Sequence, residues 1–442
     1  MSRFSLKTYG CQMNVYDADT LRTALLRSGW EESEETAADV VIYTGCSIRD
    51  KAEHKIWSDL GRYSETWRRT HRPVVAVTGC IAQNVGQDML GRFPWVCVIS
   101  GPRSIGLLPD ALLRALDGSE RIDLRDGDTR TYHAIGVPPL ERENRWKAHV
   151  TIAHGCDNFC TYCIVPYVRG RFLSRKPDDI LDEVRQLVAT GIREVTLLGQ
   201  NVNSYGSDFP DGYRFSDLLR DVASIDGIDR VRFVTSHPKD FTRDICDVME
   251  RSPKICRSIN LPIQSGSDRI LSLMNRSYTL DRYASAIGMI RERFPDAGVT
   301  SDLIVGFPGE TLEDFEDSVD ALRRFRFDLV HTAAYSPRTG TVAAGMKEQL
   351  PEEEKNRRLN VINAIQRDIA LDINRRLIGK RFGILLDGPA PKGRNAFQGR
   401  TDTDKVVILR DVCEADLGRF ALAEIVDADH WCLHGELVRF LD

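Results

Sequence analysis

The strongest constraint on the fold is an alternation of short apolar, β-branched runs with longer segments of helical character. Each helix in such a rhythm returns the chain to the same end of a sheet, so the pattern predicts parallel strands. In the first hundred residues the predicted strands are 4–10, 39–44, 74–79 and 95–100, and the predicted helices are 17–28 and 50–69. This part of the chain should form an α/β domain with a Rossmann-like parallel sheet.

The same rhythm continues in the middle of the chain. Six further strand candidates occur at 149–154, 194–200, 231–236, 258–263, 298–305 and 329–335. Repeated β/α units of roughly 30–40 residues predict a partial (β/α)6 barrel of the TIM type. A charged helical segment, 352–377, follows the last strand.

The pattern changes twice, and both changes mark domain boundaries. Charged and turn-forming residues fill the stretch before residue 147, and β-branched runs spaced by Gly, Pro and Asp fill the end of the chain. The latter pattern favours a small antiparallel β-barrel. The predicted domains are 1–118 (α/β domain), 119–146 (linker), 147–376 (partial barrel) and 377–442 (small β-barrel).

Composition and charge indicate in which compartment the protein works and how it could bind a nucleic acid. The chain has no run of about 18 apolar residues and no secretory signal, so we expect a cytoplasmic protein without a membrane segment. A net charge of −5 requires any nucleic acid to be bound by a local basic patch. Eleven cysteines in a reducing compartment are better explained as metal ligands, catalytic thiols or core residues than as disulfides.

Three cysteines fall within eight residues directly after the first predicted barrel strand. Cys156, Cys160 and Cys163 have the spacing C-x3-C-x2-C. Iron–sulfur cubes normally take four Cys ligands, so a three-cysteine loop predicts a [4Fe-4S] cluster with one iron open to a substrate such as S-adenosylmethionine (SAM). Two alternatives remain: a zinc site completed by His154, or unligated core thiols.

A second set of three thiols is dispersed in sequence. Cys11, Cys46 and Cys80 lie 35 and 34 residues apart, and each follows a glycine at the end of a predicted strand. The carboxyl ends of parallel strands share one edge of a sheet, so the three thiols can converge there. This arrangement is consistent with a second cluster, although buried hydrophobic thiols remain the alternative. We interpret Cys97, Cys246, Cys256, Cys413 and Cys432 as core or incidental thiols.

The chain resembles the radical SAM methylthiotransferases, and most closely those that form 2-methylthio-N6-isopentenyladenosine in tRNA. Beyond the three-cysteine loop, the matching segments are KTYGCQMN (7–14), CSIRDKAE (46–53), GCIAQ (79–83), IVPYVRG (164–170), GQNVNSYG (199–206), TSHP (235–238), LPIQSGS (261–267) and DLIVGFPGE (302–310). The chain departs from the family pattern at Thr44-Gly45, Ser277 and Thr339, and none of these changes removes a thiol.

The resemblance implies a reaction and a substrate. The cluster on Cys156, Cys160 and Cys163 would cleave SAM, and the auxiliary cluster on Cys11, Cys46 and Cys80 would supply or carry the inserted sulfur. A second SAM would donate the methyl group. The substrate would be the isopentenylated adenosine next to the tRNA anticodon, and the enzyme would need a one-electron reductant and a sulfur donor.

The same resemblance suggests contact residues. Gly199, Gln200 and Asn201 would bind the methionine end of SAM, and Gly306 could line the adenine pocket, although an ordinary β–α turn explains Gly306 equally well. The terminal β-barrel resembles the TRAM domain, which binds RNA. Clustered cationic side chains can contact RNA phosphates, and an aromatic side chain among them can stack on a base. The RNA-binding candidates are Arg169, Arg171, Arg175, Lys380, Arg381, Lys392, Arg394, Phe397 and Arg400.

Two competing functions remain open at this stage. Related enzymes act on threonylcarbamoyl adenosine in tRNA or on a ribosomal protein side chain, and the segments at 47–52 and 235–238 favour the isopentenyl nucleoside over these. A non-enzymatic electron carrier or redox sensor is the other candidate. It would normally have fully ligated clusters, whereas each set here offers only three thiols.

Overall fold

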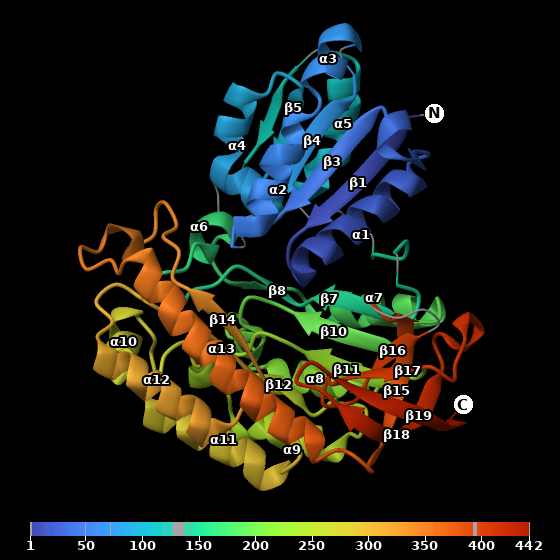
Figure 1. Ribbon diagram of the computed structural model, residues 1–442. Helices are drawn as coiled ribbons and strands as arrows, with labels where there is room; N and C mark the ends of the chain where they lie inside the picture. The colour runs from blue at the N-terminus through green and yellow to red at the C-terminus, as the bar shows by residue number, and fades with distance from the viewer. Residues whose placement is uncertain are drawn as a thin grey trace.

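The computed structural model describes residues 2–48, 50–70, 72–118, 120–125, 138–142, 144–391 and 396–441. They form three units: an N-terminal α/β unit, a central partial barrel beneath it and a small C-terminal β-barrel at the side (Figure 1). Within the described residues, no helix has the length and apolar character needed to span a membrane.

The N-terminal unit is a six-stranded, all-parallel sheet with the order β2-β1-β3-β4-β5-β6. Its strands are β1 (Arg3–Tyr9), β2 (Glu31–Glu32), β3 (Val40–Gly45), β4 (Val74–Gly79), β5 (Val96–Ser100) and β6 (Ile122–Leu124). Its helices are α1 (Gln12–Arg27), α2 (Asp50–Gly61), α3 (Ser64–Thr70), α4 (Cys80–Arg92) and α5 (Leu108–Leu116). Strands β3 and β4 are buried along their whole length, between two apolar clusters, as expected for a parallel sheet covered on both faces.

The structure refines the sequence prediction for this unit. The single helix predicted over 50–69 is two helices, α2 and α3, and strands β2 and β6 are additional. Strand β6 pairs with β5 and lies within the segment predicted as a linker, of which residues 126–137 lie outside the described part of the chain. Both additional strands have only two or three residues, which is too short for a recognisable apolar run.

The central unit confirms the predicted partial barrel of six parallel strands. These are β7 (Lys147–Thr151), β10 (Glu194–Leu198), β11 (Arg230–Phe233), β12 (Ser258–Asn260), β13 (Gly298–Val305) and β14 (Leu329–Ala334). They form two three-stranded parallel sheets, β11-β10-β7 and β12-β13-β14, and an isolated bridge between Val231 and Ile255 joins the first sheet to the segment before β12.

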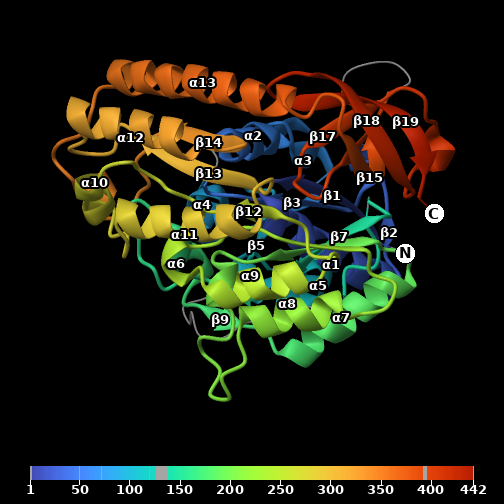
Figure 2. The ribbon, with the colours of Figure 1, turned by 90° about the horizontal axis from the view of Figure 1, so that it is seen from below.

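Helices cover the outer face of this sheet (Figure 2). They are α7 (Pro177–Ala189), α8 (Phe215–Ala223), α9 (Arg243–Arg251), α10 (Asp268–Leu273), α11 (Leu280–Arg293), α12 (Leu312–Phe325) and α13 (Glu352–Arg375). Apolar side chains of the strands and of these helices form one continuous core. A short antiparallel pair, β8 (Ala153–His154) with β9 (Leu173–Ser174), lies beside the carboxyl end of β7.

The C-terminal unit is a closed five-stranded barrel with the order β15-β16-β17-β19-β18. Its strands are β15 (Arg381–Pro389), β16 (Phe397–Arg400), β17 (Val406–Leu409), β18 (Phe420–Ala428) and β19 (Cys432–Phe440). The predicted antiparallel barrel is therefore confirmed, except that β17 and β19 pair in parallel. Strand β16 was not expected from the sequence, because a Gly and two polar residues leave it only one apolar side chain.

The C-terminal barrel is fixed to the amino ends of the central strands. Arg230, the first residue of β11, donates hydrogen bonds to the carbonyls of Arg400 and Gly383, both at 2.6 Å. Arg232 donates to the Thr401 carbonyl at 2.6 Å and forms an ion pair with Glu194 at 3.0 Å. These arginines are buried, so the C-terminal barrel docks at the end of the central barrel opposite the carboxyl ends of its strands.

We predict that Arg232→Leu destabilises the protein by about 3–5 kcal/mol, because it removes the cation nearest to the buried Glu194 carboxylate and leaves Arg230, 3.9 Å away, as the remaining ion-pair partner. Denaturant unfolding of the full chain would measure the loss. The control is Arg439→Leu on the exposed side of β19, which should change stability by less than about 0.5 kcal/mol. Equal stability of the two variants would contradict this role of the ion pair.

Candidate functional site

The three-cysteine loop lies between β8 and the short helix α6 (Val165–Arg169). Gly155 begins it with φ +71°, and a Cβ there would lie 2.1 Å from the Arg171 carbonyl oxygen, so only glycine fits this turn. The Cys156 N–H then donates to the Gly170 carbonyl at 3.1 Å, which closes the loop at its base. The loop therefore occupies the carboxyl end of β7, where active sites of β/α barrels lie.

In this loop Cys160 is buried, and Cys156 and Cys163 are partly buried. Burial raises the pKa of Cys156, and burial together with the charge of Cys160 raises the pKa of Cys163 to about 12. Arg276, which is partly buried, points one guanidinium nitrogen at the Cys160 sulfur, 3.3 Å away. Clustered thiols in such a setting become thiolates readily only when a cation compensates their charge.

The second set of cysteines converges as the sheet topology requires. Cys11, Cys46 and Cys80 follow β1, β3 and β4, which are neighbours in the sheet and paired in register at their last residues. A hydrogen bond from Cys46 outweighs burial and, with the charge of Arg169, lowers the pKa of Cys11 to about 5. Burial raises the pKa of Cys80.

Steric contacts explain why a glycine precedes each of these cysteines. A Cβ on Gly10 would lie 2.7 Å from Asn14 Oδ1, and one on Gly79 would lie 2.8 Å from the Gly45 carbonyl oxygen. A Cβ on Gly45 would lie 2.4 Å from Ile56 Cδ1. The glycines therefore let the strand ends pack closely against their neighbours.

Neither set has the compact geometry of a single-ion site. The six cysteines are all described, yet in neither set do the three sulfurs lie within 4.8 Å of one another. Thiolates on an iron–sulfur cube bind different irons and stand farther apart than the ligands of one zinc ion. This spacing does not favour the alternative of zinc completed by His154.

Arg169 connects the two cysteine sets. It is the last residue of α6, which follows the three-cysteine loop, and its Nε donates to the Cys80 sulfur at 3.1 Å. Its Nη2 forms an ion pair with Asp17 of α1 at 3.3 Å, and both side chains are at most 4% exposed. Arg169 therefore ties the end of the three-cysteine loop to the cysteine edge of the N-terminal sheet.

Further contacts bring this edge over the mouth of the central barrel. Cys80 packs with Ile164 and Val168 of the α6 segment. Cys11 packs in a cluster that includes Leu198 and Val234, at the carboxyl ends of β10 and β11. Both cysteine sets thus lie between the N-terminal sheet and the central barrel, as Figure 1 shows for the elements that bear them.

The predicted SAM contacts at the end of β10 lie beside the three-cysteine loop. A Cβ on Gly199 would lie 3.7 Å from the carbonyl oxygen of Ala153, just before the loop. Gln200 Oε1 and Asn201 Oδ1 are buried and have no hydrogen-bond partner within the protein. Buried amide oxygens of this kind require a partner, which makes them suitable for a polar ligand such as the amino group of SAM.

The neighbouring strand ends add two residues that the sequence analysis did not assign. Thr235 after β11 has φ +67°, and Ser236 carries a buried hydroxyl without a protein partner. A positive φ costs free energy at a β-branched residue, and such conformations concentrate at functional sites. Both residues belong to the TSHP segment (235–238), and its match to the family pattern was the signal for them in the sequence.

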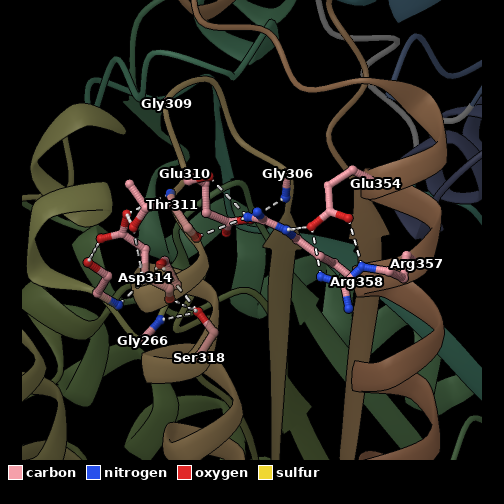
Figure 3. A network of polar contacts seen from close by, with 12 residues as sticks. Gly266, Gly306, Gly309, Glu310, Thr311, Asp314, Ser318, Glu354, Arg357 and Arg358 are labelled. Carbon is pink, nitrogen blue, oxygen red and sulfur yellow. Dashed lines mark hydrogen bonds and ion pairs between the residues drawn. The ribbon is translucent and has the colours of Figure 1, made fainter.

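Gly306 is explained by internal contacts. Figure 3 shows it at the end of β13, where its N–H donates to Glu310 Oε2 at 2.6 Å, and the same oxygen pairs with Arg358 at 2.7 Å. Its φ is +70°, and a Cβ would lie 2.3 Å from Cγ of Lys355 on α13. These contacts favour the β–α turn over the adenine-pocket alternative.

The RNA candidates near the cysteine loop differ in their surroundings. Arg169 is buried and bound to Cys80 and Asp17, so its position does not suit contact with RNA. Arg175 is mostly buried, donates to the Thr151 carbonyl at 2.6 Å and pairs with Glu183. Arg171 is 58% exposed, pairs with Asp157 and lies over the ring of Phe159, so it remains a surface candidate.

The candidates on the C-terminal barrel are mostly at its surface. Lys380 and Arg381 are exposed, and Arg381 pairs with Glu424 at 2.8 Å. Arg400 pairs with Asp404 at 3.1 Å, and Phe397 is half-buried against the barrel core. Lys392 and Arg394 lie outside the described residues.

Lys380 also lines a basic cavity of about 690 Å³ between the central and C-terminal units. Seven cationic side chains surround it, against three carboxylates. The cations are Arg257, Arg291, Arg324, Arg326, Arg376, Lys380 and Lys405. This charge balance suits a polyanion.

Comparison with known proteins gives the family. Residues 150–322 match the radical SAM superfamily, and residues 3–101 match the uncharacterized protein family UPF0004. A tRNA-2-methylthio-N(6)-dimethylallyladenosine synthase of Carboxydothermus hydrogenoformans is 44% identical over 98% of both chains. One of the same name from Caldicellulosiruptor saccharolyticus is 42% identical over 98% of this chain and 92% of that one. The chain belongs to the tRNA-2-methylthio-N(6)-dimethylallyladenosine synthase family.

Solved structures support the fold of this family member. The radical S-adenosylmethionine methyltransferase TsrM from Kitasatospora setae, with cobalamin and a [4Fe-4S] cluster bound, matches with a TM-score of 0.56 and 17% identity over 78% of this chain and 77% of that one. The cobalamin-dependent S-adenosylmethionine radical enzyme OxsB matches with a TM-score of 0.53 and 12% identity over 83% of this chain and 56% of that one.

Membership of the synthase family implies SAM and two [4Fe-4S] clusters, and the residues present fit them. Each cysteine set offers three thiols at the end of a parallel sheet, with an arginine donating to one sulfur. Around the dispersed set, the hydroxyls of Thr44, Ser47 and Thr78 are buried without a protein partner. Such polar atoms suit a bound polar group better than a plain apolar core.

We predict that Arg169→Leu impairs the N-terminal cysteine set selectively. It leaves Asp17 buried without its cation and removes the donor to Cys80, so the iron content of reconstituted protein should fall from about eight to about four per chain. SAM cleavage should remain. Arg171→Leu, two residues away and exposed, is the matched control and should keep the full iron content. Full iron content in both variants would contradict the link.

Proposed function

We propose that the protein converts N6-isopentenyladenosine next to the tRNA anticodon into its 2-methylthio derivative. The observation that carries this proposal is the placement of two three-thiol sets at facing sheet edges, joined through Arg169. One set lies at the mouth of the barrel and the other lies above it, so a substrate between them could meet both. Family membership supports the choice of substrate.

The two sets have different roles in this proposal. Cys156, Cys160 and Cys163 would hold one [4Fe-4S] cluster, and Gly199, Gln200 and Asn201 would orient SAM beside it. Cys11, Cys46 and Cys80 would hold the auxiliary cluster from which sulfur is transferred. When bound, the clusters and SAM supply radical chemistry that removes hydrogen from an unactivated C–H bond.

The residues of the chain exclude water and fix the geometry of this site. Cys46, Cys80 and Cys160 are buried and the other three thiols are partly buried, which limits the access of solvent to the reacting groups, as reactive intermediates require. Arg276 and Arg169 each donate a hydrogen bond to a thiol sulfur, of Cys160 and Cys80 respectively, and so place positive charge beside two of the ligands that would carry negative charge in a cluster. We propose that the enzyme acts in the cytoplasm on tRNA, with an external one-electron reductant and a sulfur donor.

Nucleoside mass spectrometry of tRNA from a strain lacking the gene tests the substrate. We expect the 2-methylthio-isopentenyl nucleoside to disappear, its unmethylthiolated precursor to accumulate, and the full-length protein to restore the product. Unchanged levels of this nucleoside would refute the proposal. Loss of a methylthio group from threonylcarbamoyl adenosine or from a ribosomal protein instead would favour the corresponding alternative.

Because the two clusters have different proposed roles, substitutions in the two cysteine sets should cause different defects. Cys156→Ala should abolish SAM cleavage by anaerobically reconstituted, reduced protein, because it removes a ligand of the cluster that binds SAM. Cys46→Ala should retain measurable cleavage and lose sulfur insertion into tRNA. The control, Cys413→Ala, removes an exposed thiol of the C-terminal barrel and should retain both activities. Equal loss of cleavage in both folded cluster variants would contradict the assignment.

The basic cavity predicts a contribution to tRNA affinity. Lys380→Ala should weaken tRNA binding and reduce the slope of log affinity against log salt by about one, because one fewer counterion is released. Arg323→Ala, which removes an exposed cation from α12, is the control and should leave the slope unchanged. Fluorescence anisotropy of labelled tRNA across a salt series would measure both, and equal slopes would exclude Lys380 as a phosphate contact.

A further inference from the structure

A third cluster of metal-ligand side chains lies at the turn between β18 and β19 of the C-terminal barrel. Asp429 lies in the turn, and Cys432 and His434 are the first and third residues of β19. Residues two apart on a strand share a face, and Leu433 between them is buried in the barrel core. Cys432 and His434 therefore both face outward, on the side of the turn.

The three side chains come together tightly. Cys432 Sγ lies 3.3 Å from Asp429 Oδ2 and 3.8 Å from His434 Nε2, and His434 Nε2 lies 3.8 Å from Asp429 Oδ2. This is the one group of three His, Cys or acidic side chains among the described residues whose ligand atoms all lie within 4.8 Å of one another. All three are partly exposed, so an ion could reach them from solvent.

The turn holds the Asp429 carboxylate in place without using the oxygen that faces the other ligands. Oδ1 accepts the backbone N–H groups of Trp431 at 2.5 Å and Cys432 at 2.8 Å. The Asp429 carbonyl accepts a hydrogen bond from Asn374 of α13 at 2.8 Å, which anchors the turn to the central unit. Oδ2 is thereby directed at the thiol and the imidazole before any ion arrives.

The types of the three ligand atoms indicate which metal ion the group could bind. A thiolate, an imidazole nitrogen and a carboxylate oxygen are the three ligand types of zinc, and three protein ligands leave its fourth tetrahedral position for water. Calcium and magnesium prefer sets made only of oxygen, so they are poor candidates. Without a metal, the same contacts would be only hydrogen bonds between the thiol, the carboxylate and the imidazole.

We propose that Asp429, Cys432 and His434 bind one zinc ion, or another divalent ion of similar ligand preference, separately from both three-cysteine sets. Binding would replace the Cys432 thiol proton, which leaves to solvent, and would link the turn to β19. This assignment replaces the interpretation of Cys432 as an incidental thiol. The spacing Asp-x2-Cys-x-His was present in the sequence, but one cysteine beside scattered histidines gave no reason to select it.

Metal analysis of the full chain tests the proposal. Protein with its iron–sulfur clusters already reconstituted would be exposed to zinc, freed of excess and analysed for zinc and iron. We expect one zinc per chain in the unmodified protein, and its loss in Cys432→Ser and in His434→Gln at unchanged iron content. Cobalt added in place of zinc should give a thiolate charge-transfer band that Cys432→Ser lacks.

The matched control is Cys413→Ser, which removes another thiol of the same barrel that also contacts a carboxylate, Asp416, but has no histidine in its group. It should keep the zinc. Equal zinc in Cys432→Ser and the unmodified protein, or equal loss in Cys413→Ser, would overturn the proposal and leave a hydrogen-bonded turn. The zinc readout does not use SAM cleavage, so it stands or fails independently of the proposed reaction.

Discussion

The buried contact of Arg169 with Cys80 and Asp17 is the interaction on which the rest of the site depends. The N-terminal sheet and the central barrel each bring three thiols to the carboxyl ends of their strands, but nothing in either of them alone aligns the two sets. The ion pair with Asp17 and the hydrogen bond to Cys80 do so from a helix that begins two residues after the last cysteine of the loop. Because these groups are buried, the charges cannot separate without a large desolvation penalty.

Buried polar contacts also fix the position of the C-terminal barrel. Arg230 and Arg232 fix the C-terminal barrel to the amino ends of the central strands, while the cysteine sets occupy the opposite, carboxyl ends. The chain thus places a basic, polyanion-compatible cavity at one end of the central barrel and the two cysteine sets at the other. A bound tRNA that used both would have to extend along the side of the barrel.

Sequence patterns predicted elements better than they predicted contacts. The six central strands were expected from their apolar runs, and each of them exists. By contrast, the three arginines that follow the cysteine loop were all predicted to contact RNA. In the structure Arg169 is buried, Arg175 is mostly buried and Arg171 is exposed. A sequence gives the charge of a side chain but not its solvent exposure, because exposure depends on which other elements pack against it.

By itself, the sequence determined the parallel α/β architecture, the six candidate ligands and the family, because these follow from periodicity, from thiol spacing and from matched segments. Only the tertiary structure decided that the glycines before the cysteines serve packing, that Gly306 belongs to a β–α turn, and that Asp429, Cys432 and His434 form a group. The physical reason is that each of these depends on distances of a few ångströms between atoms. Those distances are set by how the strands, turns and helices pack, and no local pattern in the chain encodes them.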